Sequence, residues 1–224
     1  NLYKYTAENV EIISAGVYMR VFKPRDPKKP RKIKMNKPYI FCLSRIDANK
    51  GHDQLLRAFS IVKDKVPGID LVIGGGSPNP KPREEKIIAG MKDIVRKNNM
   101  EDRVHIIGYV PDELLVPYYQ EAEFFVSPSI FEPLGMTSQE AMACGKAVLA
   151  SSLSGIRFVI TSSENGILAD PHKTIEFAEA MIKLIQDDKL RKRLGDNALD
   201  TVKKKYSWIA MAKKFIDFYS KYYK

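Results

Sequence analysis

Residues that build disulfides and metal sites are scarce in this sequence. Its 224 residues include two cysteines, Cys42 and Cys144, and three histidines that stand singly along the chain. Neither cysteine has the spacing of a metal-ligand pair, and both lie in apolar segments. We therefore expect reduced core residues rather than a disulfide. Isolated histidines carry no ligand pattern, so no metal site is predicted.

Long apolar runs are also missing. No segment approaches the roughly 20 apolar residues of a membrane-spanning helix, and the N-terminal segment lacks the basic region and apolar stretch of a secretory signal. We expect a cytoplasmic globular domain, for which a hydrophobic content of 44% supplies an ordinary core. Because the chain starts without Met and inside sequence typical of ordered structure, we expect part of a longer protein or a processed chain.

Acidic residues are in deficit, and the net charge is +10 at pH 7. Such a balance suits nucleic acid, anionic membrane surfaces or phosphorylated small molecules. Residues 23–37 hold eight basic residues, one acidic residue and three prolines. Because no aromatic residues interleave with these charges, we expect an exposed linker and no nucleic-acid partner. Association with a membrane surface stays open.

Beyond this linker, short apolar runs alternate with segments that have apolar residues at helical spacing. This alternation favours an α/β domain, a Rossmann-like parallel sheet with helices on both faces. The predicted strands cover residues 39–43, 69–76, 103–110, 123–129, 146–151 and 165–170. The predicted helices cover residues 51–66, 82–98, 112–122 with an interruption at Pro117, 137–144, 175–186, 189–204 and 208–223.

Ligands of such sheets bind at the carboxyl ends of the strands, so the loops there are candidate site segments. The loop after residue 43 holds Arg45 and Lys50, two cations that suit a pyrophosphate, although ordinary surface charge explains them equally well. Gly75 and Gly108 lie at the ends of the next two predicted strands, where either a tight turn or a closely approaching ligand would need glycine. The segment GGGSPNPKP matches neither G-x-G-x-x-G nor G-K-[ST].

The segment PSIFEPLGMTSQEAMACGK, residues 128–146, follows the fourth strand. Glu132 is expected in the loop, because Pro133 disfavours helical backbone at the residue before it. Gly135 relieves crowding where the chain turns into a helix. The amides of Leu134, Gly135 and Met136 would then form an anion site at the helix N-terminus. Beside a bound phosphate, Glu132 fits a contact with neutral sugar hydroxyls.

The sequence allows two roles for Glu140. Thr137 and Glu140 form the T-x-x-E pattern of a capping box, in which each side chain bonds a backbone amide at the start of the helix. The alternative is that Glu140 is a ligand residue beside Glu132. From spacing alone, the capping role is favoured.

Several segments together resemble one family. SRIDANKGHDQLLRAF, LVIGGGSP, NGILADP and residues 104–151 are similar, in order and spacing, to the C-terminal half of retaining GT-B glycosyltransferases of the group 1 (GT4-type) family. That family includes sucrose-phosphate synthases, bacterial-type glycogen synthases and many mannosyltransferases. The pair Glu132 and Glu140 matches its E-x7-E motif.

The resemblance implies roles by position. Glu132 would hold hydroxyls of the donor sugar, and Glu140 the ribose of the nucleotide. Arg45 and Lys50 would clamp the diphosphate, and the backbone at residues 134–136 would bind the distal phosphate. The base would lie against the turn at Gly108, Tyr109 and Val110, and Gly75 would also bind the substrate. The donor substrate would be a nucleoside-diphosphate sugar, with no cofactor and no metal.

The resemblance also implies a division of the chain. Residues 1–38 would be an interdomain entry segment with the basic linker, residues 39–205 the nucleotide-sugar-binding domain, and residues 206–224 a helix that packs on an absent N-terminal domain. That domain would supply the site for a sugar or other hydroxyl acceptor. We therefore expect this chain to bind nucleotide without catalysing transfer alone.

One loop departs from the family pattern. The family's Gly-Gly-x-x-Glu turn reads SGIRF here, with Ser154 in place of the first glycine and Phe158 in place of the glutamate. A non-catalytic nucleotide-binding or regulatory module of GT-B fold is the alternative function. Tight nucleotide binding without turnover in the full-length protein would favour that alternative.

Overall fold

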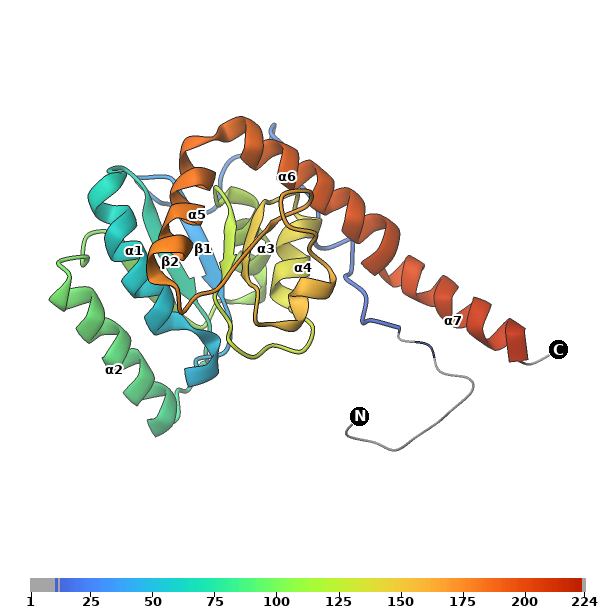
Figure 1. Cartoon of the computed structure of the whole chain (residues 1–224), viewed down its shortest axis with the longest axis horizontal. Helices are drawn as coiled ribbons and strands as arrows, with labels where there is room; N and C mark the ends of the chain where they lie inside the picture. Colours follow the sequence, from blue (N-terminus) through green and yellow to red (C-terminus); the bar gives the residue numbers. More distant parts are fainter. Residues whose placement is uncertain (1–10, 12, 223–224) are drawn as a thin grey trace.

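The computed structural model describes residue 11 and residues 13–222. Within them, six parallel strands form one sheet in the order β3-β2-β1-β4-β5-β6 (Figure 1). The strands are β1 (Tyr39–Leu43), β2 (Asp70–Gly74), β3 (Val104–Gly108), β4 (Phe125–Ser127), β5 (Val148–Ser151) and β6 (Ile167–Ala169). The predicted fold class is confirmed.

Both faces of the sheet are buried, which explains why its strands are continuous apolar runs. In β1, Ile40 and Cys42 belong to one core, whereas Tyr39 and Phe41 belong to the other. Successive side chains of a strand point to opposite faces, so each strand contributes to both cores. Cys42 and Cys144 are buried free thiols, as expected.

Helices cover the two faces. Figure 1 shows α1, α2 and α5 on one side of the sheet and α3 and α4 on the other. The α-helices are α1 (His52–Lys65), α2 (Pro82–Lys97), α3 (Asp112–Glu121), α4 (Met136–Ala143), α5 (Thr174–Gln186), α6 (Asp188–Thr201) and α7 (Trp208–Tyr222). Shorter helical turns are η1 (Ala48–Lys50), η2 (Gly155–Phe158) and η3 (Val202–Tyr206), the last of which is π-helical.

The predicted interruption at Pro117 is wrong, because α3 runs through it. Proline removes one backbone N–H. Here it lies in the second turn of the helix, so only the carbonyl four residues earlier, at exposed Glu113, loses its helical partner.

The basic linker, residues 23–37, has no helix or strand, and most of its charged residues are exposed, as predicted. It is nevertheless fastened to the body of the domain. The Glu121 carboxylate accepts the backbone N–H groups of Lys32 and Ile33 at 2.7 and 3.1 Å. Ile33 and Met35 pack against the core that contains Tyr39 and Phe41.

Helix α7 extends away from the domain (Figure 1). Trp208, Ile209, Phe215, Ile216 and Tyr219 on it are exposed. Residues preceding the linker meet the start of α7, because Val17 and Ser207 form a parallel bridge. None of the described helices is long and apolar enough to span a bilayer.

Candidate active site

The order in which strands are added to the sheet reverses between β1 and β4. From β1 the chain adds β2 and β3 on one side, then returns to place β4 on the other side. At such a switch point the loops that leave two neighbouring strands diverge, and ligands of α/β sheets bind in the crevice between them. The loop after β1 contains Lys50 and the loop after β4 contains Glu132, so both predicted residues belong to this switch point.

Backbone contacts join these two loops. The Asn49 carbonyl oxygen accepts the N–H groups of Ile130 and Phe131 at 2.9 and 3.3 Å. Gly51 has a left-handed φ of 71°, and a Cβ atom there would lie 2.1 Å from the Pro128 carbonyl oxygen. Only glycine allows this approach, which brings the residues before α1 against the end of β4.

Lys50 and Glu132 form a direct ion pair. Lys50 Nζ donates to Glu132 Oε2 at 2.6 Å, and the two side chains are 4% and 26% exposed. Burial alone raises the pKa of Glu132, but the hydrogen bond and charge of Lys50 outweigh it, so this pKa lies below its ordinary value. Glu132 is therefore a carboxylate at neutral pH.

The same carboxylate lies at the start of α4. The Gly135 N–H donates to Glu132 Oε1 at 3.4 Å. Gly135 caps the helix with a left-handed φ of 69°, and a Cβ atom there would lie 2.9 Å from Ile156 Cβ. The expected role of Gly135 at the turn is thus confirmed. The Gly135 amide thus contacts the protein's own carboxylate, and phosphate binding by the amides of residues 134–136 stays a prediction.

The predicted capping box is wrong. Helix α4 begins at Met136, so Thr137 lies inside the first turn and cannot cap it. Glu140 instead faces helix α3, where the Tyr119 hydroxyl donates to Glu140 Oε2 at 2.9 Å. Burial raises the pKa of Glu140 above its ordinary value, and the Tyr119 hydrogen bond opposes this only in part.

Arg45, the other predicted cation, is exposed in the loop after β1. Its side chain makes no hydrogen bond or ion pair with any other residue that the structure describes. The structure therefore brings Lys50 and Glu132 into direct contact. Arg45 lies in the same loop as Lys50 but makes no hydrogen bond or ion pair with either of them through its side chain.

The glycine turns after β2 and β3 contact each other. The Gly75 N–H donates to the Gly108 carbonyl oxygen at 2.7 Å. A Cβ atom on Gly75 would lie 1.7 Å from the Ser44 carbonyl oxygen, so packing against the chain itself already requires this glycine. Tyr109 is exposed and Val110 is buried, so of this pair only Tyr109 offers its side chain to a ligand.

The loop after β5 packs against the loop after β4. The Gly155 N–H donates to the Glu132 carbonyl oxygen at 2.6 Å, and a Cβ atom there would lie 1.8 Å from the Pro133 carbonyl oxygen. Ser154 is buried and donates to the Ser151 carbonyl oxygen. Phe158, where the family pattern has glutamate, is 76% exposed.

Sequence reasoning missed two residues of this region, Tyr119 and His52. The Nε2 atom of His52 lies 2.9 Å from Ser44 Oγ. Burial, together with the nearby charge of Lys50, lowers the pKa of His52 to about 4, so the ring is neutral at physiological pH. Nothing in the sequence marked Tyr119 as a partner of Glu140, because the two lie on different helices and 21 residues apart.

Unpaired polar atoms gather at this edge of the sheet. Four buried side-chain atoms lack a hydrogen-bond partner within the described residues, namely Asn49 Oδ1, His52 Nδ1, Ser138 Oγ and Gln139 Oε1. All four belong to η1 or to the first turns of α1 and α4. Because folded proteins leave few buried polar atoms unpaired, these positions call for solvent or a ligand.

The sequence matches a known family along most of its length. Residues 24–201 match the family described as glycosyl transferases group 1. Mannosylfructose-phosphate synthase of Agrobacterium fabrum is 30% identical over 177 residues, which cover 79% of this chain and 39% of that protein.

Solved structures agree. Sucrose-phosphate synthase from Thermosynechococcus elongatus has a TM-score of 0.81 at 28% identity, covering 94% of this chain and 52% of that one. The C-terminal domain of a group 1 family protein, LpcC, from Francisella tularensis has a TM-score of 0.76 at 27% identity, covering 86% of this chain and 100% of that one.

The chain thus spans 39% of the synthase from Agrobacterium and 52% of the sucrose-phosphate synthase chain, but all of a solved C-terminal domain. The chain therefore belongs to the group 1 glycosyltransferase family, and its fold is that of the C-terminal half of a GT-B enzyme.

Proposed function

We propose that this chain is the donor-binding domain of a retaining glycosyltransferase, which transfers a sugar from a nucleoside-diphosphate sugar to an acceptor hydroxyl without a metal ion. The observation that carries the proposal is the contact of Lys50 with Glu132 at the N-terminus of α4, at the switch point of the sheet. A buried cation, a helix-end amide and a carboxylate meet there, in a family of glycosyltransferases.

The leaving group explains the cations. When the sugar departs, negative charge grows on the diphosphate and positive charge grows on the sugar ring. Fixed positive groups lower the energy of that state because they need no rearrangement during the reaction. Lys50, Arg45 and the amides of residues 134–136 would supply this charge, in place of a metal ion.

Binding of the donor requires an exchange of partners at Lys50. In the structure its ammonium holds the Glu132 carboxylate at 2.6 Å. A diphosphate carries more negative charge and would take over Lys50 and the α4 amides. Glu132 is then released to accept hydrogen bonds from hydroxyls of the donor sugar. The diphosphate of the donor displaces Glu132 from Lys50, and the sugar of the same donor gives Glu132 a new hydrogen-bond partner.

Glu140 would bind the ribose. The Tyr119 hydroxyl occupies one of its carboxyl oxygens, which orients the group and leaves the other oxygen for a ribose hydroxyl. The base would lie against the turns after β2 and β3, with Gly75 and Gly108 allowing close approach and Tyr109 and Val110 framing it.

The acceptor site would lie on another part of the enzyme. The chain spans about half of the sucrose-phosphate synthase chain, and α7 leaves apolar residues uncovered. We propose that an N-terminal domain packs against α7 and carries the site for the acceptor, a sugar or another hydroxyl compound. The chain alone then binds nucleotide but does not catalyse transfer.

Two measurements test this function. Calorimetry of this chain with UDP, GDP and ADP should detect binding of at least one of them, and a transfer assay of the full-length protein with the matching nucleotide sugars should show turnover. Binding without turnover by the full-length protein would favour a non-catalytic module. No binding of any of the three would contradict the proposed donor site.

A further inference from the structure

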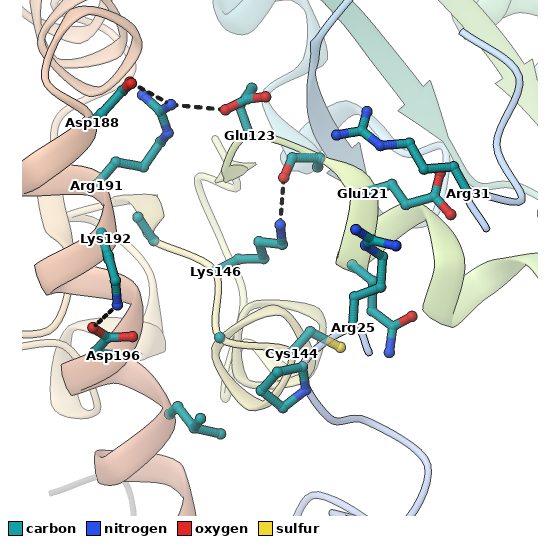
Figure 2. A pocket seen from close by; sticks show the side chains of 16 residues that line it. Arg25, Arg31, Glu121, Glu123, Cys144, Lys146, Asp188, Arg191, Lys192 and Asp196 are labelled. Carbon is teal, nitrogen blue, oxygen red and sulfur yellow. Dashed lines mark hydrogen bonds and ion pairs between the residues drawn. The ribbon is translucent and has the colours of Figure 1, made fainter. Parts of the chain in front are cut away.

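A second cavity lies at the opposite edge of the sheet. It has a volume of about 560 Å³ and is formed by residues just before β4 and β5, by α6 and by the basic linker. Figure 2 shows Lys146 in the middle of this cleft, with the side chains of α6 on one side and Arg25 and Arg31 of the linker on the other. The amino ends of the strands form this edge, so the cleft is separate from the proposed donor site.

The acidic residues of the cleft already have partners. Glu123 and Asp188 both accept from Arg191, at 2.8 and 2.6 Å, and Asp196 pairs with Lys192 at 2.6 Å. Glu121 accepts the two linker N–H groups described above. Each of the four carboxylates is thus held by a cation or by backbone.

Three cations of the cleft have no carboxylate partner within the described part of the chain. Lys146 Nζ donates one hydrogen bond, to the Ala122 carbonyl oxygen at 2.7 Å, and retains two further N–H donors. Among the described residues, Arg25 donates only to backbone carbonyl oxygens of the linker. Arg31 is exposed, and no hydrogen bond or ion pair of its side chain with a described residue is found.

The surroundings of Lys146 disfavour its charged form. Burial lowers its pKa to about 8, and the charges of Arg31 and Arg191 act in the same direction against the opposing effect of Glu123. An anion that contacts both this partly buried ammonium and the guanidinium of Arg31, which has no carboxylate partner among the described residues, would stabilise the two charges.

We propose that this cleft binds a phosphate group carried by a small organic molecule, with Lys146 and Arg31 as the phosphate ligands and Arg25 at the rim. A phosphate monoester suits these donors because its oxygens accept several charge-assisted hydrogen bonds at once. The volume of about 560 Å³ also leaves room for an organic part beyond the phosphate. The bound molecule would join the linker to the start of β5.

Titration of this chain with glycerol 3-phosphate and with inorganic phosphate, in a chloride buffer of constant ionic strength, tests the proposal. The parent should bind, and glycerol 3-phosphate should bind more tightly than inorganic phosphate. Arg31→Gln and Lys146→Met should each weaken binding about tenfold, the loss expected for a charge-assisted hydrogen bond. Arg31 is exposed, so Arg31→Gln keeps the test valid even if Lys146→Met fails to fold.

Two controls separate the cleft from other cations. Lys203→Gln removes one exposed charge from η3 and should leave binding unchanged. Arg45→Gln alters the proposed donor site, and it should likewise leave phosphate binding to the cleft unchanged. The proposal is overturned if the parent binds neither probe, if Arg31→Gln binds like the parent, or if Arg45→Gln abolishes binding. If the chain bound no nucleotide at the proposed donor site, the phosphate titrations of the cleft would still test this proposal.

Discussion

Replacing Lys50 by methionine removes the charge of the Lys50–Glu132 pair but keeps an unbranched side chain. At 2.6 Å and an effective dielectric constant of about 20, the two charges attract by about 6 kcal/mol, but burying them offsets most of this energy. In the variant, Glu132 keeps its contact with solvent and with the Gly135 N–H. We therefore expect the free energy of unfolding to fall by about 1–2 kcal/mol and the Tm by about 3–6 °C.

Glu132→Ala should cost more than Lys50→Met. It leaves the ammonium of Lys50, whose side chain is 4% exposed, without a carboxylate partner, and an unpaired buried charge costs about 3 kcal/mol or more. The double variant should lose less than the sum of the two single losses, by about 1–2 kcal/mol, because neither charge is then left alone. Urea denaturation of the four proteins measures these differences.

A matched control is Lys204→Met. Lys204 pairs with Asp200 at 2.7 Å, but the two side chains are 68% and 56% exposed. An exposed pair stabilises by about 0.5 kcal/mol or less, so this variant should be near neutral. Additive losses in the Lys50–Glu132 cycle, or a Lys50→Met loss larger than that of Glu132→Ala, would refute the reasoning from burial.

Acid should weaken the same pair. The pKa of Glu132 is lower in the folded protein than its ordinary value of about 4.3. The stabilisation is therefore present above that ordinary value and is lost as the pH falls through the lower, folded value. Lys50→Met should show a smaller loss of stability over this acid range.

Four further predictions concern the region around this pair. Arg45→Ala and Glu140→Ala should both weaken nucleoside diphosphate binding, Arg45→Ala more strongly because it removes a phosphate-binding charge; calorimetric titrations in which both bind like the parent would show the site assignment to be wrong. Tyr119→Phe should lower the free energy of unfolding by about 1–3 kcal/mol in urea denaturation, because the buried Glu140 loses its hydrogen-bond donor. His52→Gln should make the stability less sensitive to acid. The pKa of His52 is about 4 when folded and about 6.5 when unfolded, so the free energy of unfolding of the parent falls by up to about 3 kcal/mol between pH 6.5 and pH 4. An equally steep fall in the variant would contradict this assignment. Sugar transfer by the full-length protein should persist in EDTA, and complete inhibition would contradict metal independence.

The fold could be predicted because burial on both faces leaves a clear record in the sequence. A run such as residues 39–43 is apolar at every position and became β1 with the same limits. The ends of other strands differ, because backbone pairing and not hydrophobicity decides where a strand stops. The run at residues 123–129 is an example, since only Phe125–Ser127 pair with β5.

The candidate site was predictable only as a set of neighbouring loops. Parallel strands bring their carboxyl ends to one edge, so Lys50 and Glu132 were expected near each other. Their ion pair, and the bond between Tyr119 and Glu140, depend on side-chain directions that no spacing reveals. The capping pattern misled because Gly135 takes a left-handed backbone and caps the helix two residues before Thr137.

The two edges of the sheet differ in how their cations are balanced. At the carboxyl edge, Glu132 already neutralises Lys50, so any diphosphate that enters must compete with an internal carboxylate. A nucleoside diphosphate without a sugar bears that cost alone, whereas a nucleotide sugar offers hydroxyls to the displaced Glu132. At the amino edge, Lys146 is bonded to no carboxylate of the residues that the structure describes. We therefore expect the proposed donor site to favour the complete donor over the spent nucleotide, a preference that would help an enzyme to release its product.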